Sequence, residues 1–358
     1  MGEPAAVATA APLASLCARR FGAEVAVTLT ILGVLAGVVV RSLDGGPVVL
    51  LGTVVIGVAI TVGNIAVPLI IRRDFAPARQ GMAMGVYTAA LNVGSFITSA
   101  ATAPLAQATG WRLALAASAV FCVAAIAFWT AAVGFRRAFR PDADPGPAEE
   151  PSPGPGGTRA VTAALLIGFA GQAFSYYGVT AWLPTLLGDE LGLSVAAAGA
   201  GASLFQILAI AGALGTPLLA RWAGQAAAAA ALGVLWATVP LGLLLAPALW
   251  PLWSSLGGAA QGGGITLIFT AILVIARDQN AAGRMSALVQ GVGYAVAAGA
   301  PTLLGWVHTL TGSWAPPLVL VLVSVLAFGV ATLVGLRLAA RGARPRARTT
   351  SRGGVPQR

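Results

Sequence analysis

Two apolar stretches of the sequence each carry an amide and a phenol side chain four residues apart, Gln172 with Tyr176 and Gln290 with Tyr294. Residues four apart lie on the same side of a helix, so each pair offers hydrogen-bond donors, acceptors and an aromatic ring to one space. Such groups bind a small polar or anionic solute. The alternative is a structural role, because amides and phenols also hold neighbouring membrane helices together by hydrogen bonds.

The elements that carry these side chains must lie in a membrane. Only 9% of the 358 residues are charged, whereas 58% are hydrophobic, and an ordinary soluble domain carries roughly 25% charged residues. An exposed surface this apolar would aggregate in water. The composition therefore excludes a soluble globular enzyme and makes the lipid bilayer a partner of the chain.

The remaining charges and reactive side chains exclude several other functions. The formal net charge is +10, but the arginines lie in short clusters without stacking aromatic residues, so we expect no binding to nucleic acid. One histidine and two scattered cysteines provide no cluster of metal ligands. The sequence also lacks the phosphate-binding loop that ATP hydrolysis requires. We therefore expect neither an enzyme nor a cofactor or bound metal.

Stretches without charges predict eleven transmembrane helices, since a helix needs roughly 20 apolar residues to cross a bilayer. Single spans are predicted at 4–17, 25–40, 45–71, 80–111, 113–135, 160–188 and 191–220. Two longer stretches predict helical hairpins, one over 222–276 that breaks near Pro247 and one over 285–336 that breaks at His308 and Gly312. Because backbone groups must be satisfied within the bilayer and no alternating β pattern appears, the predicted fold class is an all-α membrane protein.

The arginines also predict the orientation of the chain. Nineteen of the 21 fall in segments on one side of the membrane, and only Arg41 and Arg112 fall on the other. Arginine concentrates in cytoplasmic segments, so the carboxyl terminus is expected inside and, with eleven spans, the amino terminus outside. The expected location is the inner (plasma) membrane.

A segment rich in proline and acidic residues divides the chain, and its composition predicts a solvated linker without fixed structure. The predicted organisation is an amino-terminal half over 1–137, a cytoplasmic linker over 138–158, a six-helix half over 159–337 and a basic cytoplasmic tail over 338–358.

The two halves repeat each other at an interval of 203 to 205 residues. The recurring residues are Pro12-Leu13 and Pro217-Leu218, Arg73-Asp74 and Arg277-Asp278, Met82 and Met285, and Trp111 and Trp314. Parallel repeats of helices are typical of transporters. The counterpart of the helix at 160–188 would precede residue 1, so we expect a five-plus-six arrangement whose first half lacks its first helix through a truncated start.

This arrangement resembles the major facilitator superfamily. The loop at 15–22 is similar to a degraded form of the superfamily's G-x-x-x-D-R-x-G signature, in which Arg20 and Gly22 fit while Ser15 and Arg19 replace the glycine and the aspartate. Over 12–337, more specific strings resemble the cyanate/2-nitroimidazole transporter family. They are NIAVPLIIRRDF at 64–75, GWR at 110–112, WLP at 182–184, MSALVQGVGY at 285–294 and GAP at 299–301.

The resemblance implies the superfamily fold, a pseudo-two-fold parallel repeat, and a monomeric permease that moves a small-molecule solute by alternating access. It also implies that polar side chains on the helices around the central cavity contact the solute. The candidate substrate-binding residues are Asn64, Tyr87, Asn92, Gln172, Tyr176, Tyr177, Gln206, Gln261, Gln290 and Tyr294.

Charged loop residues on the cytoplasmic side are candidates for a gate. Arg19 and Arg20 lie on the same side of the membrane as Asp74, and Arg221 lies on the same side as Asp278. These residues would form latches that close the cavity toward the cytoplasm. The alternative is that the arginines only orient the protein in the membrane.

Two other functions compete with the permease. One is efflux of drugs, and the other is a truncated membrane protein that transports nothing. The absence of Asp and Glu from the middle of the spans and the expected loss of one helix favour the second, because proton-coupled transporters use intramembrane titrating groups. The amide and phenol pairs argue against it. His308, the only histidine, is expected at an outer helix end as a solvated residue.

Overall fold

The computed structural model describes residues 21–43, 45–140 and 159–343, and every regular element within them is a helix. The first half of the chain contains α2 (Ala23–Arg41), α3 (Gly46–Asp74), α4 (Pro77–Thr109), α5 (Trp111–Ala117), α6 (Ala119–Val133) and α7 (Phe135–Phe139). The second half contains α8 (Arg159–Leu191), α9 (Val195–Ala223), α10 (Gln225–Leu245), the 3-10 turn η1 (Pro247–Leu249), α11 (Trp250–Ile275), α12 (Gln279–Thr311) and α13 (Ala315–Ala343).

Nine helical segments of the described chain are long and apolar enough to cross a membrane. The all-α membrane fold is thereby confirmed, but the count of eleven spans is not. The predicted span at 4–17 lies outside the described residues. The predicted span at 80–111 is the 33-residue helix α4, which is less apolar than the nine because it carries Gln80, Asn92 and several small polar residues.

Helix ends follow local sequence signals. The predicted break near Pro247 occurs where α10 ends, and η1 separates it from α11. The second break lies at Gly312 alone, since α12 continues past His308 to Thr311. Gly312 has a φ of +63°, a left-handed conformation that ends a helix and favours glycine.

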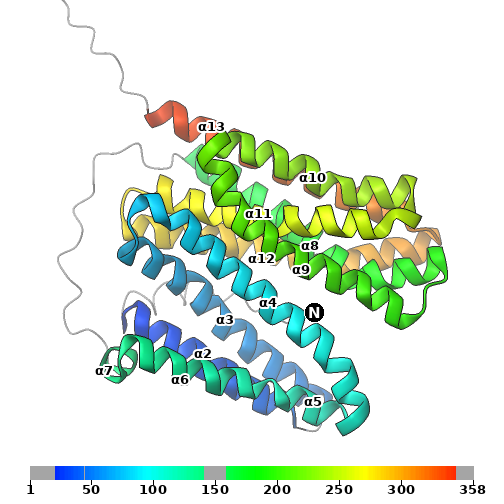
Figure 1. The fold of residues 1–358 in the computed structure, drawn as a ribbon, viewed down its shortest axis with the longest axis horizontal. Helices are drawn as coiled ribbons and strands as arrows, with labels where there is room; N and C mark the ends of the chain where they lie inside the picture. The colour runs from blue at the N-terminus through cyan, green and yellow to red at the C-terminus, as the bar shows by residue number, and fades with distance from the viewer. Residues whose placement is uncertain (1–20, 44, 141–158, 344–358) are drawn as a thin grey trace, which may run out of the picture.

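Most helices of each half pack on one another, but α4 packs mainly on α9 and α11 of the second half. In the first half, α2 packs along α3 and also contacts α6. In the second half, α8 packs against α12 and α13, and α9 packs along α11. Figure 1 shows α2 and α6 at one edge of the molecule, α10 and α13 at the other, and α4 crossing between the two groups. The described helices stop at Phe139 and resume at Arg159, so the predicted domain boundaries stay a prediction.

Small residues allow the tightest of these contacts. A Cβ atom at Gly262 of α11 would run into the backbone carbonyl of Ala209, and one at Gly212 of α9 would run into that of Ala259. Membrane helices associate by close van der Waals packing, which small side chains permit. The helices α9 and α11 are therefore closely packed along their length, and this packing positions the polar side chains that they carry.

The predicted repeat has a counterpart in the lengths of two helices, since α4 and α12 both have 33 residues. Arg73-Asp74 ends α3, three residues before α4 begins, whereas Asp278 is the N-cap of α12. Superposition of the two halves stays a prediction.

Candidate functional site

The two halves meet along a surface that we call the seam, where α3 and α4 of the first half contact α9, α11 and α12 of the second. The helices α4 and α9 cross at close range in this seam. A Cβ atom at Gly85 would lie 2.6 Å from the carbonyl oxygen of Ala213. The helices are thus in contact at this crossing, with no room for a larger side chain.

Amide side chains connect the two halves across the seam. Nε2 of Gln261 on α11 donates to Oδ1 of Asn92 on α4 at 3.3 Å. Nε2 of Gln290 on α12 donates to the backbone oxygen of Asn64 on α3 at 3.4 Å, and the hydroxyl of Tyr87 donates to Oδ1 of Asn64 at 2.9 Å. These five predicted site residues therefore lie at the seam in two hydrogen-bonded groups, Gln261 with Asn92 and Gln290 with Asn64 and Tyr87.

The hydrogen-bond partners fix the orientation of these amides. Nδ2 of Asn92 donates to the carbonyl oxygen of Thr88 at 2.8 Å, so its Oδ1 must accept, and Gln261 must present its nitrogen. The carbonyl of Asn64 likewise requires the nitrogen of Gln290. Oε1 of Gln261 and Oε1 of Gln290 are consequently buried acceptors with no partner among the described residues. An unpaired buried acceptor costs about 1–3 kcal/mol, so each oxygen favours any donor that reaches it.

Gln172 lies behind the seam, inside the second half. It is fully buried, and its Nε2 donates to the backbone oxygen of Gln261 at 2.9 Å. A Cβ atom at Gly264 would lie 3.0 Å from its Oε1, which places this end of the side chain against α11. Gln172 thus supports the segment of α11 that carries Gln261.

Aromatic rings join the remaining predicted residues. Tyr177 packs edge-to-face with Tyr176 at a ring-centroid distance of 5.1 Å and with Tyr294 at 6.3 Å. Tyr294 also packs edge-to-face on Phe169 at 5.2 Å. Nε2 of Gln206 reaches the hydroxyl oxygen of Tyr176 at 3.0 Å. Tyr176, Tyr177, Gln206 and Tyr294 therefore form one cluster across α8, α9 and α12.

A single cavity shared by Gln172, Tyr176, Gln290 and Tyr294 stays a prediction. The structure joins Tyr176 to Tyr294 through Tyr177, whereas the two glutamines bond to α11 and α3. An apolar crevice lies elsewhere, between α8, α10, α12 and α13, and is lined by residues that include Trp182, Leu304 and Trp314. None of the ten predicted residues lines it.

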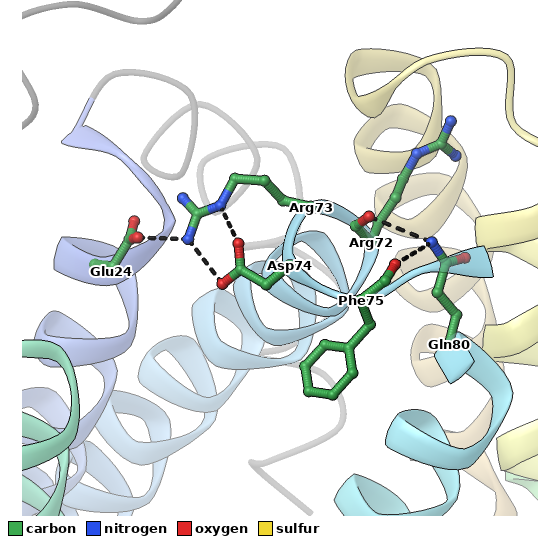
Figure 2. Close-up of polar contacts among 6 residues, drawn as sticks. All are labelled: Glu24, Arg72, Arg73, Asp74, Phe75 and Gln80. Atoms are coloured by element: carbon green, nitrogen blue, oxygen red, sulfur yellow. Dashed lines mark hydrogen bonds and ion pairs between the residues drawn. The ribbon is translucent and has the colours of Figure 1, made fainter. Parts of the chain in front are cut away.

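The described members of the predicted gate do not contact one another. Asp74 pairs with its neighbour Arg73, whose Nη2 also lies 2.6 Å from Oε1 of Glu24 within the first half (Figure 2). Asp278 caps its own helix by accepting from the backbone nitrogen of Ala281 at 2.6 Å. Arg221 is exposed in the last turn of α9. Arg19 and Arg20 lie outside the described residues, so the latch stays a prediction.

Sequence reasoning overlooked a different arginine. Nη1 of Arg72 donates to the backbone oxygen of Leu273 at 2.6 Å, and its Nη2 donates to that of Ala276 at 3.0 Å. Both bonds cross from α3 to the end of α11. From the sequence, Arg72 was assigned only to the arginines that orient the protein in the membrane. Its position beside the repeated Arg-Asp pair at a helix end could have indicated a contact with the second half.

A second polar cluster lies at the ends of α8, α12 and α13 that are far from Arg72. Nε1 of Trp314 donates to Oδ2 of Asp189 at 3.0 Å, and the His308 ring stacks on Trp314 at 3.9 Å. Nε1 of Trp182 donates to the carbonyl oxygen of Pro301 at 2.8 Å. His308 therefore lies in the last helical turn and packs on a ring, which differs from the solvated residue expected.

Comparisons with known proteins agree with this architecture. A family profile described as "Major Facilitator Superfamily" matches residues 4–301. The chain is 32% identical to the 2-nitroimidazole transporter of Escherichia coli (strain K12), over 87% of this chain and 79% of that protein. It is 26% identical to the cyanate transport protein CynX of the same organism, over 80% and 74% of the two chains. The fold also matches a proton:xylose symporter, XylE, with a TM-score of 0.70 at 11% identity, over 95% of this chain and 84% of that one.

Proposed function

Since this chain belongs to the major facilitator superfamily, we propose that it carries a small, planar, hydrogen-bonding solute whose binding site includes the amides of the seam. The chain is a multi-pass membrane protein and a secondary transporter of small solutes, as its family and relatives are. The proposal concerns which solute it moves and which residues bind it.

The observation that supports this site is a pair of amide oxygens at the seam that have no hydrogen-bond partner in the part of the chain that the structure describes. The side-chain nitrogen atoms of Gln261 and Gln290 each donate a hydrogen bond to the first half. The side-chain oxygen of each residue is buried and has no partner among the described residues. These side chains are 1% and 2% exposed, so a solute that reaches them leaves water. A donor on the solute that hydrogen-bonds to these oxygens removes the free-energy cost of leaving them unpaired.

The chemistry of the seam favours a solute with an N–H or O–H donor and a flat apolar face. The amide oxygens accept from the donor, and the cluster of Tyr176, Tyr177 and Tyr294 offers ring faces and edges. The named solutes of the relatives, 2-nitroimidazole and cyanate, are small, which supports a small solute here. Nitroimidazoles, which have a ring N–H and a planar ring, fit both features.

We further propose that the protein works as a monomer in the inner membrane with its carboxyl terminus in the cytoplasm. The 19 arginines on one side of the membrane support this orientation. The Arg72 end of the helix bundle, at which α3 ends and α4 begins, would then face the cytoplasm.

Uptake into reconstituted vesicles tests the solute and the site together. We expect saturable uptake of radiolabelled 2-nitroimidazole, and an increase of about ten-fold in KM for Gln261→Leu and Gln290→Leu, since 1.4 kcal/mol is a factor of ten. Ser118→Ala is the control, because the Ser118 hydroxyl bonds within its own helical segment to Leu115. If both glutamine variants insert and transport normally, the amides only join helices and the site assignment is wrong.

A further inference from the structure

Two consecutive arginines at the end of α3 have different partners. Arg73 is bound within the first half, to Glu24 and Asp74. Arg72 extends the other way and donates twice to the end of α11 in the second half, at Leu273 and Ala276. Figure 2 shows the two guanidinium groups on opposite sides of the helix end. Of this pair, only Arg72 bridges the seam.

The partner of Arg72 is a helix terminus. The last carbonyl groups of a helix have no partners within it and carry partial negative charge. The backbone oxygen of Leu273 is such a group, because α11 ends at Ile275, and Ala276 is the C-cap residue that follows. The arginine side chain is a rigid fork of donors that can satisfy two acceptors at once. Arg72 therefore caps α11 from the opposite half of the protein.

The backbone that carries Arg72 is held in place by Gln80. Nε2 of Gln80 lies 3.3 Å from the carbonyl oxygen of Arg72 and 3.2 Å from that of Phe75, and the side chain is only 6% exposed (Figure 2). These bonds tie the end of α3 to the start of α4. The guanidinium group is thereby positioned by both first-half helices that form the seam.

Other contacts at this end of the seam are close as well. A Cβ atom at Gly283 near the start of α12 would lie 3.9 Å from the side chain of Leu69 on α3. Gly85 and Ala213 cross on another helix pair of the seam, in the first third of α4 and the second half of α9. The described halves are in contact at the Arg72 end.

We propose that Arg72 is the latch that closes this end of the transport path. In the closed state it caps α11, and when this end opens the two bonds break and the guanidinium group is solvated. Its partners are backbone dipoles with no full negative charge, so the latch can release without separating an ion pair. The role rests on the proposed transport cycle, in which the halves separate first at one end and then at the other.

Distance measurements between spin labels test the latch. The full chain, with Cys17 and Cys122 replaced by serine, is placed in lipid nanodiscs. One label pair, Arg79→Cys with Trp222→Cys, reports on the Arg72 end, because both residues are exposed there, on α4 and α9. A second pair, Thr109→Cys with Glu190→Cys, reports on the opposite end from exposed positions on α4 and α8.

We expect Arg72→Gln to raise the long-distance population of the first pair at least five-fold and to raise the short-distance population of the second pair in parallel. Arg72→Lys, which has one point charge in place of a fork, should give an intermediate shift. Arg284→Gln is the matched control, because it removes the same charge from an exposed position on α12 near the same end. It should leave both distributions unchanged.

Two results would overturn the proposal. One is an unchanged first-pair distribution in Arg72→Gln. The other is an increase in the distance between the labels of both pairs. That result would mean that Arg72 stabilises the contact between the halves in general and does not close one end. The measurement requires no solute, so it is independent of the solute assignment. If the distance distributions shift in Arg72→Gln but the wild type takes up no solute, the latch is supported and the proposed solute is refuted. If the wild type takes up the solute but the distributions do not shift, the solute is supported and the latch is refuted.

Discussion

Gln261 and Asn92 meet across the seam, with Nε2 of Gln261 3.3 Å from Oδ1 of Asn92. Both side chains are at most 5% exposed, and each residue has a second hydrogen bond within its own half. Asn92 bonds to Thr88 on α4, and the backbone of Gln261 accepts from Gln172 on α8. This amide pair joins α4 to α11, so any separation of these two helices must break it.

Removing both partners of this pair should cost less stability than the sum of the two single removals. Asn92→Leu or Gln261→Leu alone leaves a buried amide group unpaired, which costs about 1–3 kcal/mol. The double variant removes both polar groups, so its loss of stability should be smaller than the sum of the two single losses. Thermal unfolding of the four proteins in detergent measures this difference. Additive losses would mean that the two amides do not interact.

Tyr294→Phe should weaken solute binding roughly ten-fold while the fold is retained. Phenylalanine keeps the ring that packs on Phe169 and Tyr177, so only the hydroxyl group is lost. A hydrogen bond is worth about 0.5–1.5 kcal/mol, and more when one partner is charged. Ligand-induced thermal shifts measure the affinity, and Ser118→Ala serves as the control. Unchanged affinity would assign the Tyr294 hydroxyl to helix packing.

Gly85→Ala should impair transport, whereas Gly94→Ala on the same helix should not. A Cβ atom at Gly85 would lie 2.6 Å from the carbonyl oxygen of Ala213, but nothing lies within 4 Å of one at Gly94. Overpacking costs about 1–3 kcal/mol, and here the cost falls on the contact between the halves. We expect a several-fold lower transport rate for Gly85→Ala at normal membrane abundance. Equal rates for the two variants would show that α4 and α9 need not approach so closely.

The carboxyl terminus should lie in the cytoplasm. Nineteen arginines on one side of the membrane against two on the other carry this expectation. A reporter enzyme that is active only in the cytoplasm, fused after Arg358, should be active, and a periplasmic reporter at the same place should be silent. The opposite pattern would refute both the orientation and the eleven-span count.

Local sequence was sufficient for the class of fold and for most helix ends. Long apolar stretches without charges specify membrane helices, because the bilayer requires each segment to satisfy its own backbone hydrogen bonds. Pro247 and Gly312 mark breaks that the structure confirms, since both residues interrupt a helix through their own backbone geometry. The strings that resemble the cyanate/2-nitroimidazole transporter family were equally local, and the comparisons confirm them.

The choice of partners was decided only by the tertiary structure. Arg72 and Arg73 are adjacent, identical and equally charged, yet one caps a helix of the other half and its neighbour pairs with Glu24. Gln172 and Gln290 have the same spacing to a tyrosine, yet one supports α11 from inside the second half and the other bonds across the seam. Successive helical residues point in different directions around the axis, so a partner depends on how each helix is rotated against its neighbours. That rotation is set by packing between segments far apart in the chain, such as Gly262 against Ala209. The spacing of residues within one helix therefore cannot predict it.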